Sequence, residues 1–245
     1  MPAIQISEGI WWIGVNVRSH DLFEGLWPLP HGVSLNSYLV RGEQTAVIDL
    51  VREWSGSSDT FLQQLESAGC KAGDIDYVVL NHLEPDHTGF LTNLRRMAPR
   101  ATILSTPKGV DMVRSFYGIT DGVRAVADGE ELDLGGGKVL RFVHTPFVHW
   151  PETMVTYDEE DQILFSCDAF GGYGALPGIL FDDQCADLSF MEEEALRYYS
   201  NIVAAHSAHT KRAIAKLVNT PIQMIAPSHG LIWRSHPERI FELYS

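Results

Sequence analysis

The chain has 245 residues, of which 45% are hydrophobic and 20% are charged, and its formal net charge is −14. This length allows one large domain or two small ones, and the acidic balance argues against nonspecific binding to nucleic acid or to an anionic membrane. Three cysteines without C-x-x-C spacing indicate a reducing compartment and exclude an iron–sulfur centre built from this chain alone. The sequence shows neither a leader-like N-terminus nor an apolar stretch of membrane-spanning length, so we expect a cytoplasmic protein.

Segments with strand character and segments with helix character alternate along the chain. The alternation begins with a β-meander, and no repeat, low-complexity tract or linker marks a domain boundary. We therefore expect one α+β domain over residues 1–245, folded as an αββα sandwich. Strands are expected at 10–15, 37–40, 46–50, 77–80, 101–105, 139–143, 154–157, 163–167 and 223–226, and helices at 58–68, 88–97, 108–116 and 191–217.

The sequence "NHLEPDHTG" follows the apolar run "DYVVL" and concentrates ionisable side chains at the end of a buried strand. His82, Glu84, Asp86 and His87 are ligand-type residues within six positions. One interpretation is a polar strand-to-helix loop, in which Asp86 or Thr88 caps the following helix and the histidines are incidental. The density of ligand-type residues favours a metal site over that interpretation.

Further histidine and aspartate side chains come after other expected strands. His144 and His149 lie in "HTPFVHWPETM", Asp168 lies in "LFSCDAFGGYG", and His229 lies in "IAPSHGLIW". Any one of them alone is equally explained as a hydrogen-bonded residue at a sheet edge. Because active sites commonly form where strand ends converge on one edge, the set together predicts a shared site.

The residue types in this set suit two metal ions. Two divalent ions carry four positive charges, and Glu84, Asp86 and Asp168 supply three negative ones, one of them as a bridge. Carboxylate oxygens in both halves make the set harder than a zinc site built only from histidines. Iron or manganese is therefore favoured, and iron is the one that commonly activates O2.

With these residues in view, the chain resembles the metallo-β-lactamase superfamily, whose hydrolases carry the motif H-x-H-x-D-H. Here the motif reads H-x-E-x-D-H, which resembles the di-iron domain of flavodiiron proteins, enzymes that reduce O2 or nitric oxide. The segments "LNSYLV", "VIDLV", "VLNHLEPDHTG", "HTPFVHWPETM", "LFSCDAFG", "RYYSNI" and "IAPSHGLIWR" are all similar to that family's landmarks. The resemblance covers nearly the whole chain and implies a metallo-β-lactamase-like sandwich.

The resemblance also implies a set of iron ligands. One iron is expected on His82, Glu84 and His149, the other on Asp86 and His229, with Asp168 and an oxo or hydroxo group between them. His87 matches a position that ligates the second iron in only some members of the family.

The resemblance also implies roles for residues outside the ligand set. Glu24 stands where the family often has a histidine in its substrate pocket. It is expected either to tune substrate preference or proton delivery, or simply to lie on the surface. His31 is a candidate replacement for the missing imidazole. Tyr198 or Tyr199 is expected near the metals, with core packing as the main role of whichever faces inward. Three further histidines are expected to be structural, packed or exposed: His144, His206 and His209.

The classical family members continue into a flavodoxin-like domain that binds FMN, and this sequence offers no flavodoxin phosphate loop, so no FMN site is expected in the chain. Electrons would then come from a separate donor, which makes the chain an O2 or NO reductase, and we expect it to form a homodimer. The first alternative is a sensor or binder that holds O2 as a stable peroxo-type adduct and contacts a signalling partner. The second is a zinc hydrolase.

Overall fold

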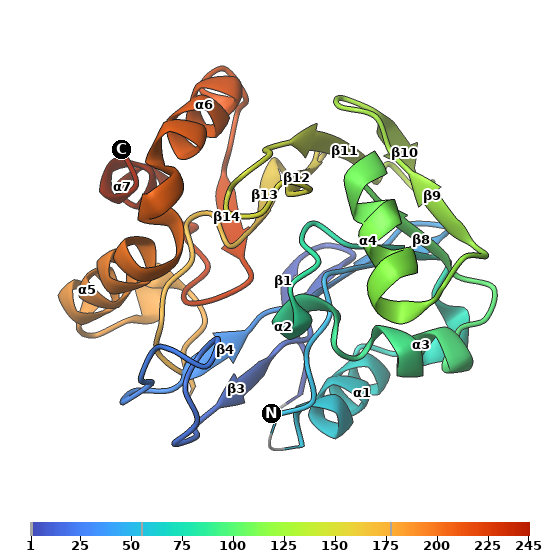
Figure 1. Cartoon of the computed structure of the whole chain (residues 1–245), viewed down its shortest axis with the longest axis horizontal. Helices are drawn as coiled ribbons and strands as arrows, with labels where there is room; N and C mark the ends of the chain where they lie inside the picture. Colours follow the sequence, from blue (N-terminus) through green and yellow to red (C-terminus); the bar gives the residue numbers. More distant parts are fainter. Residues whose placement is uncertain (1, 55, 177) are drawn as a thin grey trace.

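The computed structural model describes residues 2–54, 56–176 and 178–245 of the chain, and two β-sheets form its centre (Figure 1). In the first sheet the N-terminal strands pair antiparallel, and β6 to β9 run parallel to one another. Its strands lie in the order β1-β2-β5-β6-β7-β8-β9: β1 (Ile4–Ser7), β2 (Ile10–Trp12), β5 (Tyr38–Arg41), β6 (Thr45–Ile48), β7 (Tyr77–Val79), β8 (Thr102–Ser105) and β9 (Val123–Ala125).

The second sheet is antiparallel except at one edge, where β13 and β14 run parallel. Every residue of β12 and β13 is buried, as expected for strands covered on both faces. A separate hairpin pairs β3 (Val15–Val17) with β4 (Val33–Leu35). The strands of the second sheet follow the order β10-β11-β12-β13-β14: β10 (Glu131–Asp133), β11 (Val139–His144), β12 (Met154–Asp158), β13 (Ile163–Cys167) and β14 (Met224–Pro227).

Helices lie on the outer sides of the two sheets (Figure 1). The helices of the first half of the chain accompany the first sheet, and those of the second half lie beside β14 on the other side. This arrangement confirms the expected α+β sandwich with αββα layers. The α-helices are α1 (Ser57–Ser67), α2 (Pro85–Thr88), α3 (Leu91–Met97), α4 (Pro107–Tyr117), α5 (Leu188–Tyr198), α6 (Ser207–Leu217) and α7 (Pro237–Leu243).

Local sequence chemistry explains where the helices start and stop, and α4 is the clearest case. The Thr106 side chain accepts a hydrogen bond from the Gly109 N–H, and Pro107 occupies the first turn, where its missing N–H costs nothing. The helix ends at Gly118, whose left-handed φ of +65° is available to glycine without strain.

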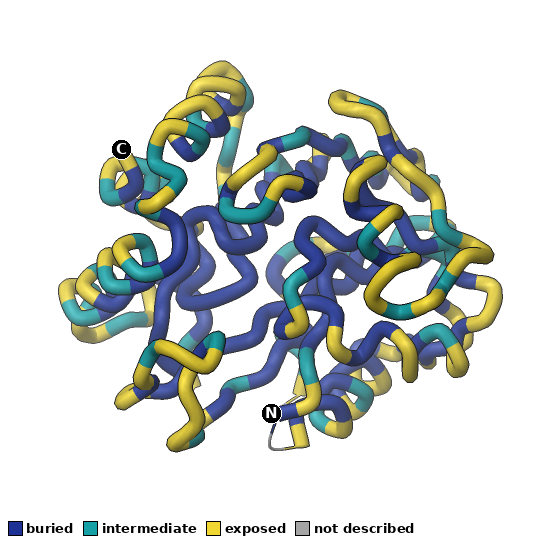
Figure 2. Tube along the Cα trace, in the orientation of Figure 1, coloured by how far each residue is buried: buried dark blue, intermediate teal, exposed yellow. Residues whose placement is uncertain are grey.

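Buried residues concentrate between the sheets, and exposed ones lie on the outer helices and loops (Figure 2). Asn81, directly after β7, joins the two sheets. It donates to the Asp49 carboxylate after β6 through both its backbone N–H and its side-chain amide, at 2.8 and 3.1 Å. Its amide oxygen accepts from the Thr156 hydroxyl in β12 at 2.7 Å. The residue before His82 is therefore fixed to both sheets.

The prediction of one long helix over residues 191–217 is wrong. The helix α5 ends at Tyr198, and a π-helical turn, Tyr199–Val203, and a 3₁₀ turn, Ala204–His206, lead into α6. Because a π turn contains an extra residue, it shifts which side chains face inward. Within α5, Leu196 is 42% exposed, whereas Tyr198 is 1% exposed.

Two further expectations need correction. The segment 88–97 is not one helix: α2 ends at Thr88 and α3 begins at Leu91. Neither Asp86 nor Thr88 is a helix cap, because both lie inside α2, and Glu84 occupies the N-cap position of that helix.

Among the described residues, no helix is long and apolar enough to cross a bilayer. The strand expected at 10–15 is divided between β2 and β3, which belong to different sheets. The strands that sequence patterns did not reveal are β1, β4, β9 and β10.

Candidate metal centre

The candidate ligands meet where several strands end. His82 follows β7 and Asp168 follows β13, while His229 comes two residues after β14 ends at Pro227. The fourth contribution, His149, comes from the loop between β11 and β12. The convergence expected from the sequence is therefore present, and it gathers side chains that are up to 147 positions apart in the chain.

One group of ligand atoms consists of His82, Glu84, His149 and one oxygen of Asp168. His82 Nε2 lies 3.3 Å from Glu84 Oε2 and 3.4 Å from Asp168 Oδ2. His149 Nε2 lies 3.0 Å from the same Glu84 oxygen and 3.2 Å from Asp168 Oδ2. Ligands about 2.1 Å from one ion are separated by about 3.0–3.4 Å, so these spacings fit a common metal ion.

A second group consists of Asp86, His87 and His229. His87 Nε2 lies 3.4 Å from Asp86 Oδ1, and His229 Nε2 lies 3.2 Å from Asp86 Oδ2. The other oxygen of Asp168 faces this group, with Oδ1 2.9 Å from His87 Nε2 and 3.5 Å from His229 Nε2. Asp168 thus turns one oxygen to each group, which is the arrangement of a bridging carboxylate.

The buried polar atoms of the cluster fit a pair of cations. Among the described residues, His82 Nε2, His87 Nε2, His229 Nε2 and both oxygens of Asp168 are inaccessible to solvent and have no hydrogen-bond partner. The contacts between them are short but poorly aligned for hydrogen bonds. Leaving such groups unsatisfied is costly unless another charge is supplied, and metal ions supply it.

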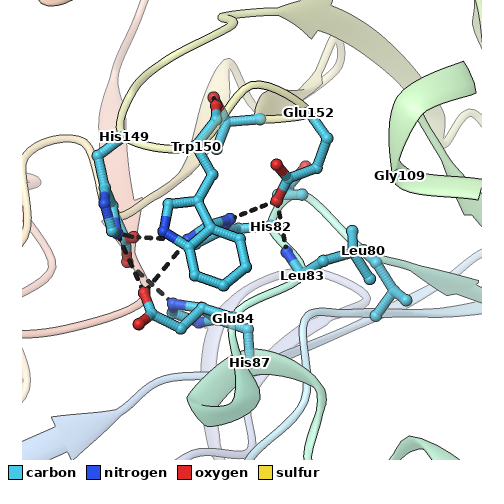
Figure 3. Close-up of polar contacts among 12 residues, drawn as sticks. Leu80, His82, Leu83, Glu84, His87, Gly109, His149, Trp150 and Glu152 are labelled. Atoms are coloured by element: carbon cyan, nitrogen blue, oxygen red, sulfur yellow. Dashed lines mark hydrogen bonds and ion pairs between the residues drawn. The ribbon is translucent and has the colours of Figure 1, made fainter. Parts of the chain in front are cut away.

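Hydrogen bonds on the far side of the rings orient them toward the centre, and Figure 3 shows the contacts behind His82. His82 Nδ1 lies 2.7 Å from Glu152 Oε1, and the Leu83 N–H donates to the same oxygen at 3.0 Å. His229 Nδ1 lies 2.7 Å from the Ser34 carbonyl. Because each Nδ1–H donates to its acceptor, each Nε2 keeps its lone pair for a metal.

Sequence reasoning missed two residues beside this cluster. Glu152 is 1% exposed, and the sequence offered only a general signal for it, namely that a metal-bound imidazole needs an acceptor for its second nitrogen. Cys167 places its sulfur within 4.8 Å of ligand atoms of His87 and Asp168. Burial raises the pKa of the Cys167 thiol well above its usual value, so the thiol is neutral there.

The charges of the cluster shift the pKa values of its members in opposite directions. Burial alone would lower the pKa of His149 and of His229. The close Asp168 carboxylate instead raises both values, together with Glu84 for His149 and Asp86 for His229, to about 9 and about 10. Burial alone would raise the pKa of Asp168, but His87 and the other imidazoles hold it well below the usual value. The ionised carboxylates are therefore stabilised by nearby positive charge. Protonated imidazoles supply that charge unless metal ions replace the protons.

Glu24 lies beside the cluster rather than on a free surface. It lines a cavity of about 230 Å³ together with Phe23, Arg52, Glu84 and Asp86. Its Oε1 is buried without a hydrogen-bond partner among the described residues, and its backbone φ is +51°. Burial and the nearby Glu84 carboxylate raise its pKa to about 7.

The remaining expected residues fall outside the cluster or at its edge. Tyr198, not Tyr199, faces inward: it is 1% exposed and its ring packs against His229 with centroids 5.5 Å apart. His31 is exposed, and its ring packs on Phe190 instead of joining the ligands. The other three histidines are structural or partly exposed: His144, next to the Val126 carbonyl, and His206 and His209, both against Phe147.

Comparisons with known proteins agree with this geometry. Residues 33–230 match the family model described as "ODP family beta lactamase". The anaerobic nitric oxide reductase flavorubredoxin of Salmonella arizonae is 38% identical over 246 residues, which cover 99% of this chain and 50% of the relative. The chain thus spans about half the length of the curated relatives it matches.

Two solved structures are also similar. The rubredoxin oxygen:oxidoreductase of the anaerobe Desulfovibrio gigas superposes with a TM-score of 0.90 at 30% identity, covering 99% of this chain and 60% of that one. The flavodiiron protein of Giardia intestinalis gives a TM-score of 0.92 at 30% identity, covering 100% of this chain and 58% of that one.

Proposed function

The chain belongs to the ODP family of β-lactamases, and from that premise we propose that it is a non-haem di-iron protein that binds and reduces O2 or NO with electrons from a separate donor. The observation that carries this proposal is the position of Asp168, whose two oxygens face two separate groups of ligand atoms. Glu84 in the first group makes that group harder than a histidine-only zinc site. The similar proteins include a nitric oxide reductase and an oxygen oxidoreductase, which supports the choice of substrates.

The proposed ligands divide into two sets that share one residue. His82, Glu84 and His149 would hold one iron, and Asp86, His87 and His229 the other, with Asp168 between them. When bound, two ferrous ions would supply two electrons and open positions for a diatomic ligand. Reduction of two NO molecules to N2O consumes two electrons, whereas reduction of O2 to water consumes four, so continued O2 reduction requires a donor.

The protein's own groups prepare the site for that chemistry. Glu152 and Ser34 hold the His82 and His229 rings in one orientation, so little reorganisation is needed when metal binds. Trp150 packs edge-on against the His82 ring, with centroids 5.0 Å apart, and shields it from water. Glu24 is the non-ligand carboxyl lining the cavity beside Glu84 and is positioned to hold a proton there.

One experiment separates this proposal from its alternatives. Protein produced with ample iron should contain about two irons per chain, and the anaerobically reduced form should be mixed with O2 or NO and followed by absorbance. Sustained consumption of either gas with a reductant present supports the reductase. A long-lived coloured complex without consumption identifies a binder or sensor, and zinc with hydrolase turnover would refute the di-iron proposal.

A matched variant tests the residue on which the metal choice depends. Glu84→Asp keeps a carboxylate in the first group and should retain iron, although more weakly because the shorter side chain moves its oxygen. Glu84→Gln removes the charge at nearly constant shape. If Glu84→Gln retains as much iron as the parent protein, the carboxylate is not a ligand.

A further inference from the structure

The proposed function needs electrons from outside the chain, and the exposure of the ligands indicates where they enter. The side chains of His149 and Glu84 are 10% and 12% exposed, whereas those of the other proposed ligands are at most 6% exposed. Electron transfer slows steeply as the separation grows, so a donor must approach the face that carries these two side chains. The loop containing His149 is therefore the part of the site nearest to a partner.

An exposed aromatic side chain lies in that loop, two residues before His149. Phe147 is 40% exposed and has a backbone φ of +65°, which is unusual for a residue other than glycine. Its N–H donates to the Trp150 carbonyl at 2.7 Å, so the loop is closed on itself. Large aromatic side chains held rigidly at the surface are typical contact residues in protein interfaces.

The helix beside Phe147 carries positive charge. The Phe147 ring packs against His209 with centroids 4.7 Å apart, and the Arg212 guanidinium donates to His209 Nδ1 at 2.8 Å. Lys211 and Arg212 are exposed on α6, and within the described residues neither forms an ion pair with a carboxylate. One turn later Lys216 is paired with Asp128, so it adds less free charge to this face.

This positive charge is unusual for the chain. Residues 195–237 contain no aspartate or glutamate, although the whole sequence has 32 of them and a net charge of −14. The α6 helix around Lys211 and Arg212 therefore contributes positive but no negative side chains to its surface. Such asymmetry steers an acidic partner toward α6 and speeds its association.

We propose that Phe147, Lys211 and Arg212 form a docking surface for an acidic electron-carrier protein, which delivers electrons to the metal centre beside His149. The inference rests on the proposed function. With iron bound, each docking event would oxidise the carrier by one electron and reduce one ferric ion to the ferrous state, so two events would reload the site. A small contact suits this role, because redox partners associate briefly through interfaces at the low end of the size range.

The kinetic test uses the iron-loaded, oxidised protein and a reduced rubredoxin of acidic isoelectric point, since rubredoxin occurs in the names of two relatives. Anaerobic stopped-flow mixing measures the bimolecular rate of carrier oxidation over a range of salt concentrations. The double variant Lys211→Glu/Arg212→Glu should lose at least about tenfold in rate at low salt, and the loss should shrink as salt is added. Phe147→Ala should lose on the order of tenfold with unchanged iron content.

The matched control reverses the same number of charges elsewhere. Arg100 and Lys108 are exposed and, among the described residues, form no ion pair, and Arg100→Glu/Lys108→Glu changes the net charge equally. This control should stay within about threefold of the parent protein, because it leaves the docking surface intact. An equal loss in both double variants would show that only net charge matters and would overturn the proposal.

A second readout does not depend on the iron chemistry. Resonances of ¹⁵N-labelled, zinc-substituted rubredoxin should broaden when the parent protein is added and should broaden much less with Lys211→Glu/Arg212→Glu. Photoreduced deazaflavin, a small neutral reductant, should reduce the parent and all variants at equal rates. If it reduces the parent but rubredoxin neither binds nor reduces it, the docking surface is refuted and the proposed function stands. If the reduced protein ignores O2 and NO while rubredoxin still binds at α6, the proposed function fails and the docking surface stands.

Discussion

Replacing Glu152 by alanine should weaken one of the two proposed metal positions and spare the other. The Glu152 carboxylate holds the His82 ring through Nδ1 at 2.7 Å and also accepts the Leu83 N–H at 3.0 Å. The alanine variant leaves His82 free to rotate or to change tautomer, so its Nε2 is no longer fixed toward the centre. His87 and His229 do not contact Glu152, and their group should keep its affinity.

The size of the effect follows from the role of such acceptors. Loss of a partner behind a metal-bound histidine typically lowers metal affinity by about 10- to 100-fold, which corresponds to about 1.4–2.7 kcal/mol. Glu152 is only 1% exposed, so solvent screening reduces this value little. Glu152→Gln keeps an acceptor oxygen at nearly the same place and should recover part of the loss.

Anaerobic titration with Fe(II), or with Co(II) as a spectroscopic substitute, resolves the two positions. Glu152→Ala should show one binding step unchanged and one shifted to lower affinity. Glu194→Gln serves as the control, because Glu194 is also a buried carboxylate but pairs with Arg197 at 2.7 Å. Two unchanged steps in Glu152→Ala, or equal weakening of both in the control, would contradict the role given to Glu152.

Three further predictions concern the same centre. Glu84→His should lower iron retention and raise zinc retention when measured by elemental analysis after growth in both metals, and an unchanged metal ratio would refute the account of Glu84. The pKa values of His149 and His229 are raised to about 9 and about 10, so their contribution to the stability of metal-free protein is complete below pH ~6.5 and disappears as the pH rises through 9–10. Urea unfolding should therefore show metal-free protein less stable at pH 10 than at pH 6.5, and a flat profile would exclude the raised values. Glu24→Gly should raise the free energy of unfolding by roughly 1 kcal/mol, because glycine accepts the +51° φ without strain, whereas Glu24→Ala should not.

The sequence predicted the candidate site better than it predicted the helices. The residues from His82 to His87 are local in sequence, and the separate ligands His149, Asp168 and His229 each follow a recognisable apolar strand, so their convergence could be anticipated. Glu152 could not be ranked above the other acidic residues, because its contact with His82 joins positions 70 apart. Whether each ligand binds iron stays a prediction until metal is measured.

The helical error has a physical cause that single-sequence periodicity cannot reveal. The π turn at Tyr199–Val203 adds a residue to the turn, so no single 3.6-residue pattern runs through both α5 and α6. The strands β9 and β10 were missed because most of their residues are exposed, and alternation of apolar and polar residues is then too weak to indicate a strand.

The hydrogen bonds of Asn81 determine what must be included if this metal centre is transplanted into another β-sandwich. Its amide is directional, with the NH2 group toward the Asp49 carboxylate on one sheet and the oxygen toward the Thr156 hydroxyl on the other. Aspartate at this position would put a second negative charge against Asp49, and leucine would leave both partners without a bond. A transplanted centre therefore needs the ligand motif together with Asn81, Asp49 and Thr156. If the ligands were transplanted alone, no side-chain hydrogen bonds at this position would fix the distance between the two sheets.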